Sequence, residues 1–251
     1  MSVSIGKGAT RGVVVAMVVT VGASWAWLIL VASQMGDMSS VLAMPMTSAW
    51  SGVQVALMVL MWVVMMSAMM LPSAMPMVVA YDRIDRASPP ARRGSAAAFV
   101  AGYLVLWGAF AVAAAGLQWL LHSTALVDSM GVATRPWFAG GLLVAAGATQ
   151  FSAWKVAMLR ACRTPMGFLA SSWQDGTSGA LRMGLHHGRV CLGCCSILMG
   201  LLFVLGVMNL AWLTALAGFI LAEKVLSRGE LVSRVGGVLL MSWGVIVMIG
   251  V

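Results

Sequence analysis

Cysteine is the residue type whose spacing in this sequence points most directly to chemistry. Three of the 4 cysteines, Cys191, Cys194 and Cys195, fall within one short run. Residues spaced by four lie on one face of a helix. The column on that face would be His187, Cys191, Cys195 and Met199, with Cys194 beside it. Thiol sulfur and imidazole nitrogen are metal ligands, so this face predicts a metal site.

Cys162 lies in a different apolar segment, one helical turn after Met158. We expect the cytoplasmic ends of two membrane helices to bring Cys162 to the depth of the other three thiols. That side is reducing, so free thiols are expected rather than disulfides. The alternative is that the thiols are small packing residues, with Gly188 and Gly193 allowing close helix contact.

Methionine is the compositional outlier, with 22 residues. In the segment 53–79 its helical spacing forms a stripe of Met58, Met61, Met65 and Met69, with Met66 and Met70 beside it. Pro72 and Pro76 follow and are expected to interrupt the backbone hydrogen bonds and kink the helix. A predicted outer loop adds Met35, Met38, Met44 and Met46. We expect these methionines to capture an ion and pass it inward, unless they serve only as flexible core filler.

Thiolate and thioether sulfur together favour copper, as Cu(I), over harder ions. Zinc is the second choice, because cysteine and histidine suit it whereas methionine does not. The predicted metal-binding residues are Cys191, Cys194, Cys195, Cys162, His187, Met158, Met199, Met65, Met66, Met69 and Met70.

The composition places these residues in a membrane. Hydrophobic residues make up 61% of the 251 positions and charged residues 9%, against about 25% charged in a soluble domain. The chain is expected to form one integral membrane domain, residues 1–251, with short loops in the lipid bilayer. Its net charge of +8 comes from loop residues and does not indicate nucleic-acid binding. The first apolar run is too long for a cleaved signal peptide.

Seven apolar runs predict an all-α, polytopic bundle of about seven transmembrane helices. The runs cover residues 13–33, 53–79, 96–121, 136–157, 185–207, 210–224 and 232–250. Of the 15 Lys and Arg residues, all but Arg135 fall in segments on one side, which the positive-inside rule assigns to the cytoplasm. We therefore expect a multi-pass protein of the bacterial inner (plasma) membrane, with the N-terminus inside and the C-terminus outside.

Two details of this topology stay open. The runs on either side of Asn209 form either two spans or one broken hairpin; the loop charges favour two, with Asn209 capping the second helix. Glu223 and Lys224 end the sixth run, where a lysine can reach the lipid headgroups, so we expect them to anchor that helix.

Several rare strings occur in an order that resembles a known bacterial family. They are Met69-Met-Leu-Pro-Ser73, Cys162-Arg-Thr-Pro165, Cys191-Leu-Gly-Cys-Cys195 with Met199, Gly206-Val-Met-Asn-Leu210 followed by Trp212, and Glu223-Lys224. Over about residues 53–250 the chain resembles a family of predicted metal-binding integral membrane proteins. The resemblance implies a polytopic inner-membrane protein with a cysteine-based metal site. Met158 stands where that family often has cysteine, and Ser196 where it tends to have tryptophan. The first exchange keeps a sulfur ligand for copper but would damage a zinc site.

The sequence contains no Ser–His–Asp arrangement, no phosphate-binding glycine loop and no paired carboxylates, so neither hydrolysis nor ATP-driven pumping is predicted. We expect a protein that binds, carries or delivers Cu(I), with a cuproenzyme or metallochaperone as partner, rather than an enzyme. One alternative is a membrane oxidoreductase or oxidase-complex subunit with a cysteine-based redox or cofactor site. Another is an assembly partner whose sulfur side chains only pack.

Overall fold

The computed structural model describes residues 7–34, 52–89 and 93–250, and the regular elements in these ranges are all helices. They are α1 (Lys7–Gln34), α2 (Gly52–Ala87), α3 (Ala96–Ser123), α4 (Pro136–Thr149), α5 (Ala153–Arg163), α6 (Pro165–Ser172), α7 (Gly176–Met199), α8 (Leu202–Leu205), α9 (Leu210–Val225) and α10 (Gly229–Ile249). The all-α prediction is confirmed for these residues. The loop methionines Met35, Met38, Met44 and Met46 lie outside them.

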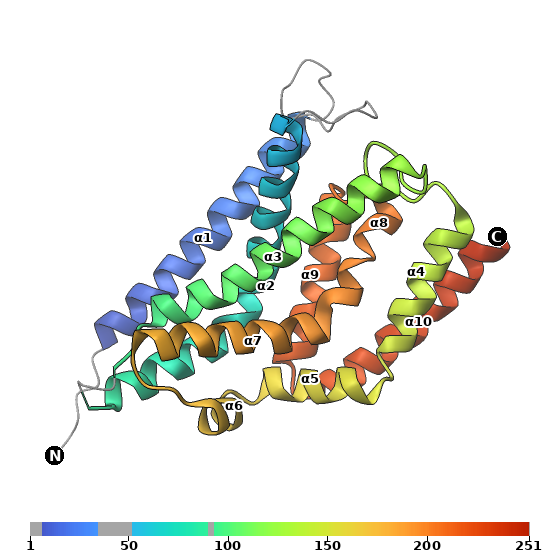
Figure 1. Cartoon of the computed structure of the whole chain (residues 1–251). Coiled ribbons are helices and arrows are strands. Elements are labelled where there is room, and N and C mark those ends of the chain that lie inside the picture. Colours follow the sequence, from blue (N-terminus) through green and yellow to red (C-terminus); the bar gives the residue numbers. More distant parts are fainter. Residues whose placement is uncertain (1–6, 35–51, 90–92, 251) are drawn as a thin grey trace.

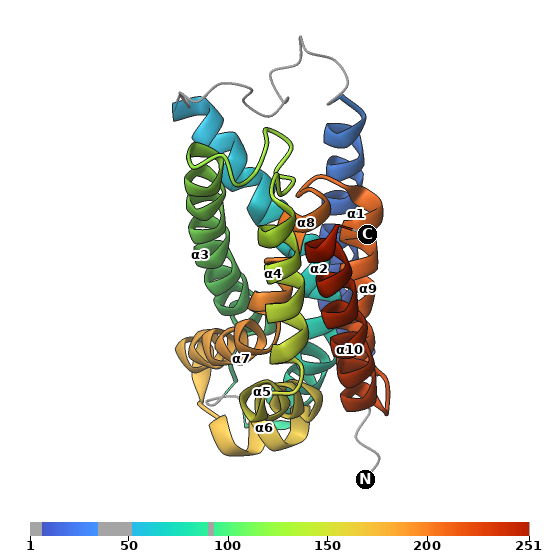
Figure 2. The ribbon, with the colours of Figure 1, turned by 90° about the vertical axis from the view of Figure 1, so that its right-hand side faces the viewer.

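Most of the helices run along one direction as a bundle, with α5 and α6 at one end (Figures 1 and 2). Among the described residues, 5 helical segments are long and apolar enough to cross a membrane: α1, α2, α3, α7 with α8, and α10. Helices α4 and α5 together would make a sixth, bent by 66°. Helix α9 has 16 residues, which gives about 24 Å at 1.5 Å per residue, short of a hydrocarbon core of about 30 Å. Length and composition thus support five or six spans, where the sequence predicts seven.

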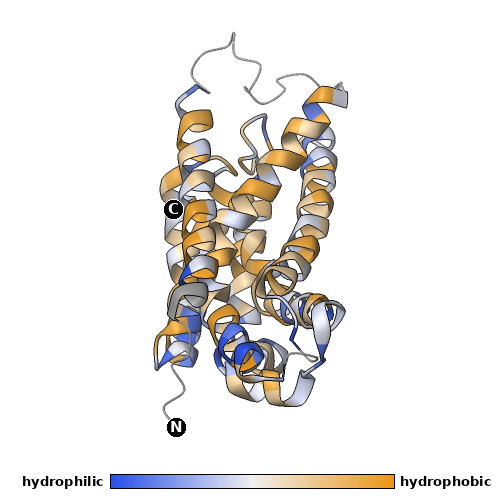
Figure 3. Cartoon of the chain, turned by 90° about the vertical axis from the view of Figure 1, so that its left-hand side faces the viewer, coloured by the Kyte–Doolittle hydropathy of each residue, from blue (hydrophilic) through white to orange (hydrophobic). Residues whose placement is uncertain are grey.

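The outer surface of the bundle is apolar along its length. Val19, Val105 and Leu239 are each more than 60% exposed, as lipid-facing side chains would be. Hydrophilic residues gather mainly at the end of the bundle where α1 begins and α2 ends (Figure 3). This distribution fits several helices that cross a bilayer together.

The predicted span 136–157 is two helices rather than one. Helix α4 ends at Thr149, and α5 starts after Ser152, whose side chain accepts a hydrogen bond from the backbone N–H of Lys155. A serine in this position caps a new helix by satisfying one of its free N–H groups. The bend lays α5 across the end of the bundle (Figure 1), so the segment that carries Cys162 lies beneath the other helices.

Helix α2 continues through Pro72 and Pro76, although neither proline has an N–H to donate to the carbonyl four residues earlier. Hydroxyl groups supply backbone hydrogen bonds in this segment: the carbonyl of Met70 accepts from Ser73 Oγ at 2.9 Å and from Tyr103 Oη at 3.2 Å. The methionine stripe therefore stays on one continuous helix.

The helix α10 packs closely against α4 through glycines. A Cβ atom added at Gly140 would meet the carbonyl oxygen of Gly244 at 2.5 Å, and one at Gly147 would meet that of Gly237 at 2.7 Å. Small residues at such contacts let two membrane helices approach. The pair α4–α10 fixes where α4 ends, and with it the start of α5.

Candidate metal centre

Helix α7 carries three of the cysteines and is held tightly by its neighbours. Against α3, a Cβ added at Gly184 would clash with the backbone of Phe99, and one added at Gly102 with the backbone of Leu181. On its other side, a Cβ at Gly193 would lie 3.1 Å from the side chain of Met158 in α5. The glycines thus place α7 between α3 and α5, which sets the position of its thiols.

The thiols of α7 lie inside the protein and not toward lipid. Cys191, Cys194 and Cys195 are at most 3% exposed. The sulfur of Cys194 lies 3.0 Å from that of Cys195 and 3.9 Å from that of Cys162, which comes from α5. All 4 cysteines are free. Helices α5 and α7 therefore contribute thiols to one cluster, the thiol cluster of Cys162, Cys191, Cys194 and Cys195.

Cys191 has two polar neighbours that come from other helices. Its sulfur lies 3.1 Å from the hydroxyl of Tyr103 and 2.9 Å from Nζ of Lys224. Nζ of Lys224 also donates to the hydroxyl of Ser73 in α2, at 3.1 Å. The expectation that Lys224 anchors α9 at the lipid headgroups is wrong, because only 8% of this residue is exposed. The C-terminal end of α9 packs inward at the level of Cys191, so the side chain meets sulfur.

A buried ion pair lies next to the thiols. Nζ of Lys155 is 2.9 Å from Oε2 of Glu223 and donates to the carbonyl of Cys194 at 2.6 Å. Glu223 is fully buried, so its expected anchoring role is also wrong. Lys155 is one of the basic residues that the positive-inside rule assigns to the cytoplasmic side, yet only 3% of it is exposed. The pair connects α5, α7 and α9 around Cys194.

His187 lies one helical turn before Cys191, in an aromatic environment. Its ring centroid is 5.5 Å from that of Tyr103, 5.5 Å from that of Phe168 and 6.1 Å from that of Phe99. Within the described part of the chain, its Nδ1 atom has no hydrogen-bond partner. The imidazole is thus available as a ligand, although packing against rings accounts for most of its contacts.

Met158 lies in α5, one helical turn before Cys162 of the thiol cluster. Its sulfur packs against α7 at Gly193, where an added Cβ would be 3.2 Å away. Gly193 points about 160° away from Cys191 and Cys195 at 100° per residue. Met158 thus approaches α7 on a side away from Cys191 and Cys195, and its predicted role as a sulfur ligand beside Cys162 stays a prediction.

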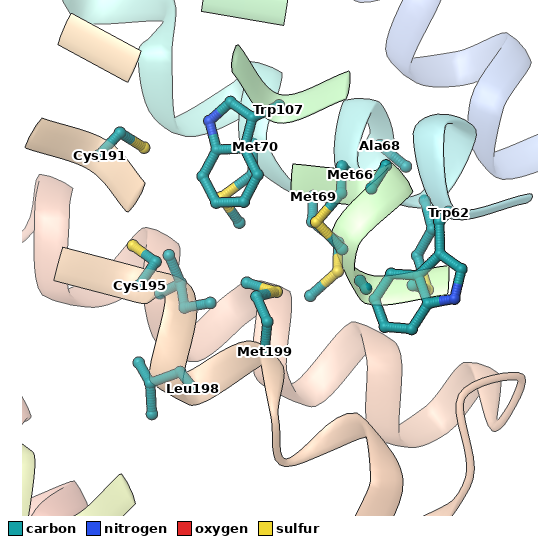
Figure 4. Close-up of a cluster of buried hydrophobic side chains, with 14 of the residues drawn as sticks. Trp62, Met66, Ala68, Met69, Met70, Trp107, Cys191, Cys195, Leu198 and Met199 are labelled. Carbon is teal, nitrogen blue, oxygen red and sulfur yellow. The ribbon is translucent and has the colours of Figure 1, made fainter. Parts of the chain in front are cut away.

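The remaining predicted methionines are buried with the thiols. Met65, Met66, Met69 and Met70 of α2 and Met199 of α7 are at most 2% exposed. They belong to one core cluster that also contains Cys191 and Cys195. Figure 4 shows these two cysteines at one end of the cluster, Met70 and Met199 near them, and Met66 and Met69 farther along toward Trp62. Sulfur atoms from α2 and α7 thus extend from the thiols into the bundle.

The donor atoms around the thiol cluster indicate what kind of metal ion could bind there. In the parts of the chain that the structure describes, no three or more His, Cys, Asp or Glu side chains are arranged as a ready metal site. The one carboxylate beside the thiols, Glu223, is paired with Lys155. Sulfur atoms are the donors that converge, and this set suits a soft ion.

Sequence reasoning identified the sulfur residues here but missed their polar neighbours. Tyr103 carries no pattern that singles it out. Ser73 ends the string Met69-Met-Leu-Pro-Ser73 that carries the family resemblance, and Lys224 and Glu223 carry a signal of their own. They are ionisable residues at the end of an apolar run, which are functional candidates in membrane proteins.

A family model described as PpoB2, copper chaperone, matches residues 59–247. This range agrees with the part of the chain that resembles predicted metal-binding membrane proteins. No curated protein and no solved structure matches the chain. The match covers α3 to α9 in full, most of α2 and nearly all of α10, and so includes every residue of the thiol cluster.

Proposed function

Because the chain belongs to the PpoB2 copper chaperone family, we propose that it binds Cu(I) within the membrane and delivers it to a partner protein. The thiol cluster would hold the ion. The methionines Met65, Met66, Met69, Met70 and Met199 would carry it between the thiols and the other end of the bundle. A cuproenzyme or a second metallochaperone is the expected partner.

One observation carries this proposal: the buried thiols of α7, with the partly buried Cys162 of α5 beside them, share a core with a methionine stripe of α2. Thiol and thioether sulfur together select Cu(I), whereas zinc sites use thiol and imidazole without thioether. Copper is therefore the expected cargo and zinc the second choice. His187 would be an additional ligand next to Cys191.

We also propose that the protein crosses the inner membrane seven times, with its N-terminus in the cytoplasm. The thiol cluster would then lie toward the cytoplasmic face, because the ends of α2, α5 and α9 that surround it carry the basic residues. That location is reducing and keeps thiols available for copper.

The test is metal analysis of protein purified in mild detergent from copper-supplemented cells. We expect copper near one ion per chain. The triple variant C191S/C194S/C195S should lose at least about 90% of it, because hydroxyl oxygen is a hard ligand and binds Cu(I) poorly.

The control is the single variant S196A, which changes a neighbouring residue of α7 and leaves the thiols intact. It should keep wild-type copper. All variants need the same gel-filtration profile as the wild type. Protein that carries zinc alone, or a triple variant with undiminished copper, would contradict the proposal.

A further inference from the structure

Lys224 places a positive charge inside the sulfur cluster. Its ammonium group lies 2.9 Å from the sulfur of Cys191 and 3.1 Å from the hydroxyl of Ser73. A buried charge is costly unless it is paired and hydrogen-bonded. A cation in this position therefore requires a negative partner close by.

Among the described residues next to Lys224, sulfur is the partner available for this charge. The neighbouring carboxylate, Glu223, is bound to Lys155 at 2.9 Å, and the two neutralise each other. Among the described residues, none of the ion pairs includes Lys224. Ser73 is neutral. By geometry Cys191 is the group next to Lys224 that would balance its charge, as a thiolate facing an ammonium group.

At a site of two thiolates, this pairing matches the charge of a monovalent ion. When Cu(I) binds to the Cys191 thiolate and to one neighbouring thiol, the S–H bond of that thiol breaks, a sulfur–copper bond forms and the proton leaves to the cytoplasm. Two thiolates, one Cu(I) and the Lys224 ammonium then sum to zero. A divalent ion in the same place leaves one uncompensated positive charge in a buried site, which is unfavourable.

We propose that Lys224 makes the thiol cluster selective for a monovalent ion over divalent ions. This inference rests on the proposed function, because it concerns the same site. Lys224 acts through the sulfur atoms and does not touch the metal. Its contribution is a fixed charge that favours Cu(I) and disfavours zinc or cadmium.

The experiment compares two metals on the same purified protein. Cu(I) affinity is measured by competition with a chromogenic Cu(I) chelator, and Cd(II) affinity by the ultraviolet absorption of its bonds to thiolate. We expect K224M and K224Q to lower the ratio of Cu(I) to Cd(II) affinity by about tenfold or more, since one buried charge is removed. K224R keeps the charge and should keep the ratio.

R228M serves as the matched control, because it removes a positive charge from an exposed residue four positions away. It should leave both affinities unchanged. Glutamine at position 224 can still donate hydrogen bonds, so a purely structural role of Lys224 would be rescued in K224Q while the charge effect would not. A ratio that stays the same in K224M and K224Q overturns the inference even if Cu(I) binds. Failure of the wild type to bind Cu(I) refutes the proposed function itself.

Discussion

At the scale of single residues, the ion pair between Lys155 and Glu223 should contribute to stability mainly because it is buried. The two side chains are 3% and 1% exposed, and their charged atoms lie 2.9 Å apart. Removing one member leaves the other as an uncompensated buried charge, which costs about 3–5 kcal/mol. We therefore expect E223Q and K155M each to lower the thermal unfolding temperature of the detergent-solubilised protein clearly.

The double variant K155M/E223Q tests this explanation, because it leaves no unpaired charge. It should recover much of the stability lost by the single variants. The comparison pair is Arg160 and Glu230, whose side chains are 65% and 32% exposed. There R160M should change the unfolding temperature little, because solvent screens an exposed ion pair. If K155M and E223Q lower the stability no more than R160M does, the pair of Lys155 and Glu223 is solvated.

The residues that could be predicted from sequence are those with a strong local pattern. Spacing by four anticipates that Cys191 and Cys195 share a face of α7, and it needs no knowledge of other helices. Lys224 and Glu223 were misplaced because their position in the sequence, at the end of an apolar run, resembles that of headgroup anchors. Their burial depends on how α9 packs against α2 and α5, which no local pattern encodes.

At the scale of elements, leucine variants of the methionines in α2 and α7 test whether Cu(I) binding needs their sulfur atoms or only their volume. Leucine is close to methionine in volume, and such exchanges in a core usually cost less than about 1.5 kcal/mol. The double variant M69L/M199L should therefore fold. We expect its Cu(I) affinity, measured by chelator competition, to fall by about tenfold, or roughly 1.4 kcal/mol.

The matched control for the stripe is M17L/M183L. Both methionines are buried, at 3% and 1% exposure, but neither belongs to the predicted metal-binding set. This variant should keep wild-type affinity. If M69L/M199L behaves in the same way, the methionines of α2 and α7 serve only to fill the core.

The elements themselves were largely predictable, since each of the seven apolar runs corresponds to helix in the structure. What failed was the course of the chain between residues 136 and 184, where α4, α5 and α6 replace one span and a loop. Helix α4 ends at Thr149, and Ser152 caps α5. Inside an apolar run, these residues are weak signals for a helix boundary. The bend also depends on the glycine contacts of α4 with α10, which join segments distant in sequence.

For the whole molecule, if the pair α4–α5 makes one crossing, the number of spans depends on α9. If α9 crosses the bilayer, the chain crosses seven times and its two ends lie on opposite sides. If it does not, six crossings place both ends on the same side. The end of α10 lies beside the start of α4, away from the end of the bundle where α1 begins (Figure 1), which favours seven. The short length of α9 is compatible with crossing if flanking residues extend to the interface or the bilayer thins locally.

Reporter fusions distinguish the two topologies. With seven spans, the loop between α9 and α10 lies in the cytoplasm together with Arg228, as the positive-inside rule requires. Alkaline phosphatase, active only outside, should then be inactive when fused after Ser227 and active after Val251. A green fluorescent protein, fluorescent inside, should give the opposite pattern at both sites. A fusion after Asp128 in the α3–α4 loop is outside in either topology and serves as the control. Phosphatase activity after Ser227 with none after Val251 would reduce the number of spans to six and contradict the outer position of the C-terminus.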